Sequence, residues 1–536
     1  MPVQDGSQQV LICGAGPTGL VLALWLAKRQ VPFRIIDKAP RAGIASRALV
    51  IQARTLEFYR MLGIDQAIIA HTRKVDQLRL WVKQRQAGTV FFGREAIEIS
   101  PFPHFYVFPQ DEHEELLEQE LDKLGVRIER NTELLAFEET AGGIDAHLRT
   151  VDGETTENAT IRVAYLAGCD GSHSKVRETL GADFPGGTYD PIYYVADIVA
   201  SGPVVNNDLN LALDDADFLA VFPMRGEDRV RLVGTVAAGQ PGGQPPQPQT
   251  SHPPHPPQPQ TGHPLQPQTP GDPAPATLQW EDVSRDILGR LQLEEKTVNW
   301  FSTYRVHHRV ASFFQKGRAF LCGDAAHVHS PVGGQGMNTG IGDAINLAWK
   351  LDAVLQRDAP ASLLDTYEKE RRPFALSLVN TTDRVFTFIN QHSRLATMIW
   401  TRLAPVIMPR LFRIAAIRRA AFRLVSQTRI HYRGSRLSAG AAGSLRGGDR
   451  LPWLARQDNY APLASLDWQI HCYGPPPAAV ADWCGHTRLP LHTFAPTDHI
   501  PAGTVCLIRP DGHIGWIGRS AYREGLTAYA ATWRLT

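Results

Sequence analysis

Short apolar runs recur along the chain, and three of them are followed at once by glycine and then by a helical pattern. The first is Val10–Cys13, the second ends at Ala167, and the third is Ala319–Cys322. Short apolar runs bounded by glycine are typical of buried strands, and apolar residues spaced three or four apart are typical of helices. Because strands alternate with helices in these segments, the pattern predicts an α/β fold.

The first of these units carries glycines at a spacing that predicts a dinucleotide site. Gly14, Gly16 and Gly19 follow the strand directly, and a second strand, Phe33–Ile36, ends in Asp37. In this order Gly14 permits a tight turn, Gly16 lets the backbone approach a pyrophosphate, and Gly19 lets helix and strand pack closely. Asp37 would hold the ribose hydroxyls of adenosine. The pattern does not separate FAD from NAD, and a purely structural turn is the alternative.

The third unit, from Gly317 to Leu351, is a second candidate for ligand binding. Its strand stops at Gly323-Asp324, a turn rich in proline and glycine follows, and a helix is expected from about Gly340. Spacing along that helix predicts one buried face, formed by Ile341, Ala344, Ile345, Ala348, Leu351 and Leu355. A glycine loop before a helix start offers backbone N–H groups and a partial positive charge, and Asp324 can accept hydroxyl protons. A capping aspartate in a tight turn is the structural alternative.

The wording of this unit, GDAAHVHSPVGGQGMNTGIGDAINLAWKL, resembles the GD motif of the FAD-dependent aromatic hydroxylases, flavoprotein monooxygenases of the para-hydroxybenzoate hydroxylase type. It is most similar to the branch that includes 3-(3-hydroxyphenyl)propionate hydroxylase and the polyketide ring hydroxylases. The resemblance implies that Asp324 binds the ribityl chain of FAD and that Pro331 lies beside the reacting ring edge. Gly336, Met337 and Asn338 would wrap the pyrimidine end of the flavin.

Three further residues gain a role from the same resemblance. Arg47 matches an arginine that reaches the FAD phosphates, and Gln110 matches a flavin-contacting glutamine. Asp170 lies in a segment that resembles the DG motif, which touches the FAD pyrophosphate and helps to receive the nicotinamide cofactor. The structural alternatives are a solvated arginine, a residue at a helix start and an ordinary turn. No second strand-GxGxxG-helix unit occurs in the sequence, so NAD(P)H is not expected to have a Rossmann domain of its own.

The resemblance and the composition together divide the chain into four parts. The FAD-binding domain is expected in three pieces, at 1–75, 105–185 and 305–360, and a β-sheet substrate domain in two, at 76–104 and 186–304. A helical region at 361–433 and a thioredoxin-like domain without the CxxC pair at 434–536 are expected to follow. The substrate domain contains a Pro- and Gln-rich tract at 240–275, which we interpret as a disordered insert. Tyr194, Phe222 and Met224 are candidate pocket residues.

Composition excludes several classes of function. Hydrophobic residues make up 43% of the 536 residues, charged residues 20%, and the net charge is +1, which gives no argument for nucleic acid. No apolar run is long enough to span a membrane, and the start of the chain lacks a signal peptide. The six cysteines form no CxxC pair and no metal pattern. We therefore expect a reduced, cytoplasmic protein without a metal. The Arg-rich amphipathic stretch Met398–Leu424 is interpreted as a helix of a soluble enzyme, with a membrane surface as the alternative.

The resemblance implies NAD(P)H- and O2-dependent hydroxylation of a phenolic or polycyclic aromatic substrate through a flavin C4a-hydroperoxide. FAD would be the cofactor and NADPH or NADH the co-substrate. Because the flavin carries the chemistry, we assign no catalytic side chain. Two alternatives stay open: an FAD-dependent reductase of unsaturated lipids, and a non-catalytic flavin-binding scaffold. A homodimer contact through the C-terminal domain is also left open.

Overall fold

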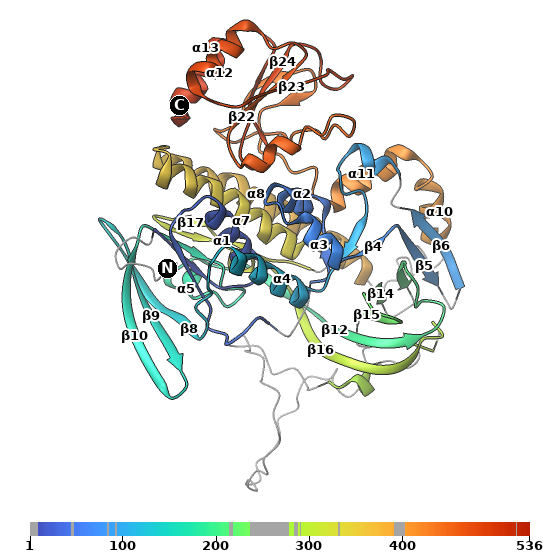
Figure 1. The fold of residues 1–536 in the computed structure, drawn as a ribbon. Coiled ribbons are helices and arrows are strands. Elements are labelled where there is room, and N and C mark those ends of the chain that lie inside the picture. The colour runs from blue at the N-terminus through green and yellow to red at the C-terminus, as the bar shows by residue number, and fades with distance from the viewer. Residues whose placement is uncertain are drawn as a thin grey trace.

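The computed structural model of the protein (Figure 1) describes most of the chain. The described ranges are 9–43, 48–82, 85–91, 94–213, 218–235, 278–283, 288–289, 291–330, 333–390, 403–520 and 522–535. The Pro- and Gln-rich insert, Arg47 and Pro331 lie outside these ranges, so the predictions made for them stay predictions.

A five-stranded sheet brings together all three of the strand units that the sequence predicts. Its strands, in spatial order, are β17 (Gln315–Lys316), β18 (Ala319–Leu321), β11 (Tyr165–Gly168), β1 (Val10–Cys13) and β2 (Phe33–Ile36). β1 pairs in parallel with both β2 and β11, and β11 pairs in parallel with β18. The carboxyl ends of these four strands therefore meet at one edge of the sheet, where open α/β sheets bind ligands.

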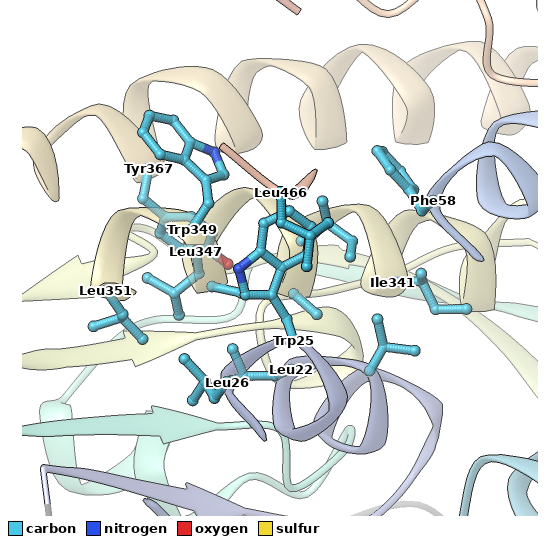
Figure 2. Close-up of a cluster of buried hydrophobic side chains, with 14 of the residues drawn as sticks. Leu22, Trp25, Leu26, Phe58, Ile341, Leu347, Trp349, Leu351, Tyr367 and Leu466 are labelled. Carbon is cyan, nitrogen blue, oxygen red and sulfur yellow. The ribbon is translucent and has the colours of Figure 1, made fainter. Parts of the chain in front are cut away.

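Helix α7 (Gly336–Gln356) is the most deeply buried helix around this sheet. It begins four residues before the predicted start, and every residue from Asn338 to Ala353 is buried, whereas the sequence predicts a single buried face. Figure 2 shows why: Leu22, Trp25 and Leu26 of α1 (Pro17–Lys28) pack against it from one side, and Leu466 of the C-terminal part approaches from another. Helix α8 (Thr366–Asn390) also packs on it. Because other elements enclose α7, its polar residues are buried along with its apolar ones.

An eight-stranded sheet forms the second layer. Its order is β19 (His327–Val328), β16 (Glu294–Val310), β12 (Gly186–Ser201), β15 (Arg229–Thr235), β14 (Phe218–Pro223), β13 (Leu209–Leu213), β5 (Gln77–Val82) and β6 (Arg85–Phe91). The pairing of β13 with β5 joins the two segments predicted for the substrate domain. Strand β19 lies within the predicted flavin loop and pairs with β16, so the loop is tied directly to this sheet.

Smaller elements fill the space around the two sheets. Two three-stranded sheets are formed by β3 (Val50–Ile51), β7 (Phe105–Val107) and β4 (Arg73–Val75), and by β10 (Thr155–Val163), β9 (Gly143–Asp152) and β8 (Thr132–Thr140). The accompanying helices are α2 (Ala53–Met61), α3 (Asp65–His71), α4 (Gln110–Lys123) and α5 (Lys175–Leu180). The domain boundaries themselves stay a prediction.

The C-terminal part folds around a sheet of its own, at the top of Figure 1. In spatial order it contains β21 (Leu445–Arg446), β20 (Ala439–Ala442), β25 (Ile514–Gly518), β24 (Thr504–Ile508), β22 (Gln469–Tyr473) and β23 (Leu491–Phe494), with α12 (Ala478–Thr487) and α13 (Tyr522–Trp533). Strand β22 is parallel to β23 and antiparallel to β24. The thioredoxin-like assignment stays a prediction.

Buried charges join this part to α7 and α8. Arg509, fully buried, donates to both carboxylate oxygens of Glu370 at 2.8 and 3.0 Å, and Lys350 on α7 donates to Glu370 at 2.9 Å. Asp511 accepts from Arg509 and from the indole of Trp349 on α7. Burial alone would raise the pKa of Glu370, but Arg509 and Lys350 lower it to about 2. The C-terminal sheet is therefore attached through ion pairs that no water reaches.

Two short helices, α10 (Ala404–Leu411) and α11 (Ala415–Val425), follow α8. They lie at the margin of the molecule in Figure 1, where α10 contacts β6 and α11 contacts the 3-10 turn Arg94–Glu98. No helix in the described part of the chain is both long and apolar enough to cross a membrane.

Candidate functional site

The carboxyl edge of the five-stranded sheet brings four of the predicted site residues together. Gly14 follows β1, Asp37 follows β2, Asp170 follows β11 and Asp324 follows β18. Hydrogen bonds hold the strand ends in register: Gly14 N donates to Ile36 O at 2.8 Å, and the loop amides after β11 and β18 donate to the strands beside them. The glycine fingerprint, the DG-like segment and the GD segment therefore form one continuous edge.

The three fingerprint glycines meet different surroundings. Gly14 has a φ of +100°, and a Cβ there would lie 2.3 Å from the carbonyl oxygen of Cys169. A Cβ on Gly19 would lie 2.0 Å from the carbonyl oxygen of Gly14. Around Gly16, by contrast, no atom lies within 4 Å of the Cβ position. Since Gly16 also begins helix α1, this empty space at a helix start fits a pyrophosphate.

Asp37 shapes the loop where adenosine is expected. Its carboxylate accepts hydrogen bonds from the backbone N–H groups of Ala15, at 2.7 Å, and Ala39, at 2.8 Å. Arg130 lies 3.8 Å away. Each carboxylate oxygen has two lone pairs, so these contacts leave acceptor capacity for ribose hydroxyls.

Gln110 braces the segment that precedes β3. Its side chain accepts from Ala48 N at 3.2 Å and donates to Glu114 at 2.8 Å. Glu114 in turn accepts from Gly43 N, and burial raises the pKa of Glu114 to about 7. The predicted flavin contact of Gln110 stays a prediction. In the structure this side chain links Ala48, through Glu114, to Gly43.

Asp170 caps helix α5. It accepts from Ser174 Oγ at 2.6 Å and from Val176 N at 3.1 Å, and burial raises its pKa. Arg177, which the sequence reasoning did not select, donates to Ser172 O at 2.8 Å and to Ala325 O at 3.1 Å. This guanidinium therefore links the DG-like loop to the GD loop across the sheet edge.

Asp324 is exposed at the start of the GD loop, and the loop packs tightly behind it. A Cβ on Gly323 would lie 2.6 Å from Thr18 Oγ1 of α1, and one on Gly340 of α7 would lie 2.4 Å from the same atom. Helices α1 and α7 thus converge on the loop with their N-terminal ends. Helix N-termini favour negative charge, which suits both a pyrophosphate and the pyrimidine end of a reduced flavin.

Asn338 has a structural role that the sequence did not reveal. Its amide accepts from Gln52 N and Thr55 Oγ1 and donates to Val50 O and Gly334 O, all within 2.9 Å. These four bonds use the full capacity of the side chain. Of Asn338, only the backbone is therefore left to face a flavin, alongside Gly336 and Met337 in the first turn of α7.

His329 offers an acceptor on the same loop. Its Nδ1 lies 2.8 Å from Ser330 O and is therefore assigned the proton, and burial lowers the pKa of His329 to about 4. The neutral ring leaves Nε2 as an acceptor, and that atom, like Ser330 Oγ, is buried without a hydrogen-bond partner among the described residues. Two orphaned polar atoms beside Gly336 fit a polar ligand in this loop.

Asp343 anchors the loop from below. Its carboxylate accepts from Gly323 N at 3.1 Å, from His327 Nε2 at 2.7 Å and from Arg371 Nε at 2.6 Å. Arg371 also donates to Tyr432 Oη and Thr339 O. Burial would raise the pKa of Asp343, but Arg371 and His327 hold it below its usual range. In the sequence, Asp343 is a charged residue among the apolar residues of the predicted helix. This is the signal from which its anchoring role could have been inferred.

The structure separates the three candidate pocket residues. Phe222 and Met224 pack in one apolar cluster with Leu49, Val50, Val75 and Val107. A Cβ on Gly334 of the flavin loop would lie 2.9 Å from the Cβ of Val50, so this cluster adjoins the loop. Tyr194 pairs with Gly234 on the neighbouring strand, and Gly234 pairs with Leu219 on the next. Tyr194 and Leu219 belong to a second apolar cluster, on the other face of the sheet. Only Phe222 and Met224 therefore adjoin the candidate site.

A family profile described as an FAD binding domain matches residues 7–382. The chain belongs to this family. It is 33% identical to 6-methylpretetramide 4-monooxygenase of Streptomyces rimosus over 76% of its length, and it spans 66% of the length of that relative. It is 30% identical to a flavin-dependent monooxygenase of Mycobacteroides abscessus, over 94% of this chain and 96% of that one. Among solved structures, the anhydrotetracycline hydroxylase OxyS of S. rimosus matches with a TM-score of 0.73 and 26% identity over 98% of both chains.

Membership in this family of FAD-dependent monooxygenases confirms the resemblance found in the sequence, including the α/β fold and the cofactor. The geometry described above fits FAD: a sheet edge with two helix starts, an open glycine, and carboxylates at the expected strand ends. The individual residue contacts with FAD stay proposals.

Proposed function

We propose that the protein uses NAD(P)H and O2 to hydroxylate a phenolic or polycyclic aromatic substrate. One observation carries the proposal: the glycine loop at the start of α7 packs directly on the apolar cluster that contains Phe222 and Met224. A flavin held by that loop would lie beside an apolar wall. The names of relatives that act on 6-methylpretetramide and pentachlorophenol support an aromatic substrate.

The protein's own residues would bind the cofactor and keep water away from it. Asp37 would hold the adenosine ribose, the backbone at Gly16 the pyrophosphate, and Asp324 the ribityl chain. Amides in the first turn of α7 would stabilise negative charge at the pyrimidine end of the flavin. When bound, FAD supplies the redox chemistry, taking two electrons from a nicotinamide and activating O2 at its C4a position. Phe222 and Met224 would exclude water from the substrate side.

Stopped-flow reduction of the flavin by NADPH and by NADH tests this function. We expect at least tenfold faster flavin reduction when the right aromatic compound is present, since a substrate that favours the reducible state by about 1.4 kcal/mol shifts the population tenfold. Candidates should include simple phenols and tetracyclic polyketides. The product should carry one added oxygen atom that is labelled from 18O2 and not from water.

Two results would contradict the proposal. Steady NAD(P)H consumption that no aromatic compound changes, with peroxide as the only oxygen product, would indicate an oxidase or a reductase. A flavin that no nicotinamide reduces would indicate a binding scaffold. The comparisons favour neither alternative. The Gly16→Asp variant, expected to lack flavin, serves as the background in each assay. A cytoplasmic location and a homodimer stay predictions.

A further inference from the structure

Helices α10 and α11 leave an unusual amount of apolar surface uncovered. Six of the ten large apolar side chains that are exposed in the described ranges belong to the short segment 403–424. They are Leu403, Val406, Ile407, Leu411, Ile414 and Leu424, each between 43% and 56% exposed. The segment rests against the edge strand β6 and the 3-10 turn Arg94–Glu98, where Ile97 is also exposed. Clustered apolar exposure of this kind marks an interaction site.

The apolar stripe of α10 does not pack into the core. Leu403, Ile407 and Leu411 are spaced by four residues, so they form one stripe along α10. No residue of α11 is buried, although eight of its eleven residues are Ala, Ile, Leu, Phe or Val, at positions 415, 416, 417, 420, 421, 422, 424 and 425. The sequence predicts an amphipathic helix that packs within a soluble enzyme. In the structure the stripe along α10 is exposed instead, whereas Phe422 of α11 packs partly against the main core.

The sequence around this segment is strongly basic. Residues 384–448 contain twelve arginines and no Asp, Glu or Lys, although the whole chain has a net charge of only +1. Five of these arginines lie within the exposed segment: Arg410, Arg413, Arg418, Arg419 and Arg423. Among the residues that the structure describes, Arg410 and Arg418 donate to backbone carbonyls, and Arg413 and Arg423 pair with no carboxylate. The charges of Arg413 and Arg423 are therefore not neutralised by a carboxylate of the described residues.

We propose that α10 and α11 dock on an anionic phospholipid surface without crossing it. Acyl chains would take up the aliphatic stripe, and lipid phosphates would pair with the arginine guanidinium groups. Two signals, apolar area and basic charge, are what a stable interfacial contact requires. A second copy of the chain fits less well, because a symmetric contact through this face would bring the arginines of two copies together.

Vesicle flotation of the full-length holoenzyme tests the proposal. Vesicles of phosphatidylcholine with phosphatidylglycerol should bind at least tenfold more protein than vesicles of phosphatidylcholine alone. Raising NaCl from about 0.05 M to about 0.5 M should release much of the bound protein, because ions screen contacts with lipid phosphates. Ile407→Glu/Leu411→Glu and Arg410→Glu/Arg413→Glu should each lower binding at least tenfold.

A matched control pair lies elsewhere on the surface. Leu124 and Val151 are as exposed as Leu411, at 43% and 42%, so Leu124→Glu/Val151→Glu should bind vesicles like the wild type. A milder variant covers the case in which the charge reversals fail to fold. Tryptophan in Leu411→Trp should be quenched by vesicles with brominated acyl chains, whereas tryptophan in Leu124→Trp should not.

Three results would overturn the proposal. One is no flotation with phosphatidylglycerol vesicles together with no quenching of Leu411→Trp. Another is equal binding to both vesicle types that the paired glutamate variants leave unchanged. The third is a wild-type protein that light scattering shows to be a dimer and that Ile407→Glu/Leu411→Glu converts to a monomer. A second copy of the chain would then occupy this face.

Discussion

At the scale of single residues, the fingerprint glycines show how one motif combines two kinds of constraint. Gly14 and Gly19 lack a side chain because backbone atoms occupy the space, at 2.3 and 2.0 Å from the Cβ positions. Gly16 has free space around it and stands at the start of a helix. Gly14 and Gly19 therefore serve packing, whereas the space at Gly16 stays open for the proposed pyrophosphate contact. Substitution at Gly16 separates cofactor binding from folding.

Gly16→Asp should abolish flavin binding while leaving the fold intact. The new carboxylate has room in the empty site but would repel the pyrophosphate at the helix start. FAD affinity should fall at least about 100-fold, equal to about 2.8 kcal/mol. Flavin absorbance per protein and circular dichroism measure the two effects. Gly142→Asp, in an exposed turn with equal room for a Cβ, should keep full flavin content. A yellow Gly16→Asp protein would refute the assignment.

Glu114 should make the protein less stable as the pH rises. Burial raises its folded pKa to about 7 from an ordinary value of 4.5. Protonated Glu114 therefore contributes its full stabilisation, up to about 3 kcal/mol of the free energy of unfolding, below about pH 4.5. This contribution is lost as the pH rises through 7. Urea unfolding between pH 5 and 8 should show this decline in the wild type. It should be absent in Glu114→Gln and unchanged in Glu115→Gln, the exposed neighbour on α4.

At the scale of elements, α7 combines a helix start at the proposed flavin site with a body enclosed by the protein. Its buried Asp343 ties the GD loop, through Gly323 N and His327, to Arg371 on α8. The loop is therefore positioned by a partner on another helix as well as by its own glycines. Removing that partner leaves a buried carboxylate short of positive charge.

Arg371→Leu should destabilise the protein by about 3–5 kcal/mol and lower its flavin content, since breaking a buried ion pair leaves an uncompensated charge. Arg372→Leu is the matched control, because the half-buried Arg372 makes one bond, to Ala311 O. Its effect should stay below about 1.5 kcal/mol. Denaturant unfolding and flavin release measure both variants. Equal losses in the two would show that the Asp343 pair does not anchor the loop.

The elements also show what the sequence could and could not predict. Strands β1 and β2, the glycine spacing and Asp37 were predictable because they lie within 28 residues of one another. The partners of Asp343 and the four bonds of Asn338 were not, because they come from distant segments such as Gln52 and Arg371. Tyr194 was grouped with Phe222 because alternation along a strand shows which of its residues share a face. It does not show which face of the sheet adjoins the flavin loop.

At the scale of the whole molecule, the C-terminal part is continuous with the nucleotide-binding core. Arg509, Glu370, Lys350 and Asp511 form one buried set of charges that spans the contact with α7 and α8. Trp349 on α7 reaches Trp468 of the C-terminal part, with ring centroids 5.7 Å apart. Apolar side chains of both parts also belong to a single cluster. The two parts should therefore unfold together.

Arg509→Leu should lower the free energy of unfolding by about 3–5 kcal/mol, because Glu370 and Asp511 each lose a buried cationic partner. Tryptophan fluorescence and flavin release should still report one shared transition, moved to lower denaturant. Arg519→Leu, near the surface with one bond to Ala502 O, should change little. Two separate transitions in the wild type would instead show that the C-terminal part is an independent module.

The strand order of the first sheet also has a consequence for synthesis of the chain. β1 and β2 leave the ribosome early, but β18, which completes the sheet edge, follows after roughly 300 further residues. At about 5–20 residues per second that delay is roughly 15 to 60 s. During this time the nascent chain has apolar strand edges without their final neighbours, which are sites of aggregation. Expression at lower temperature or with added chaperones should therefore raise the yield of flavin-loaded protein more than adding riboflavin to the medium.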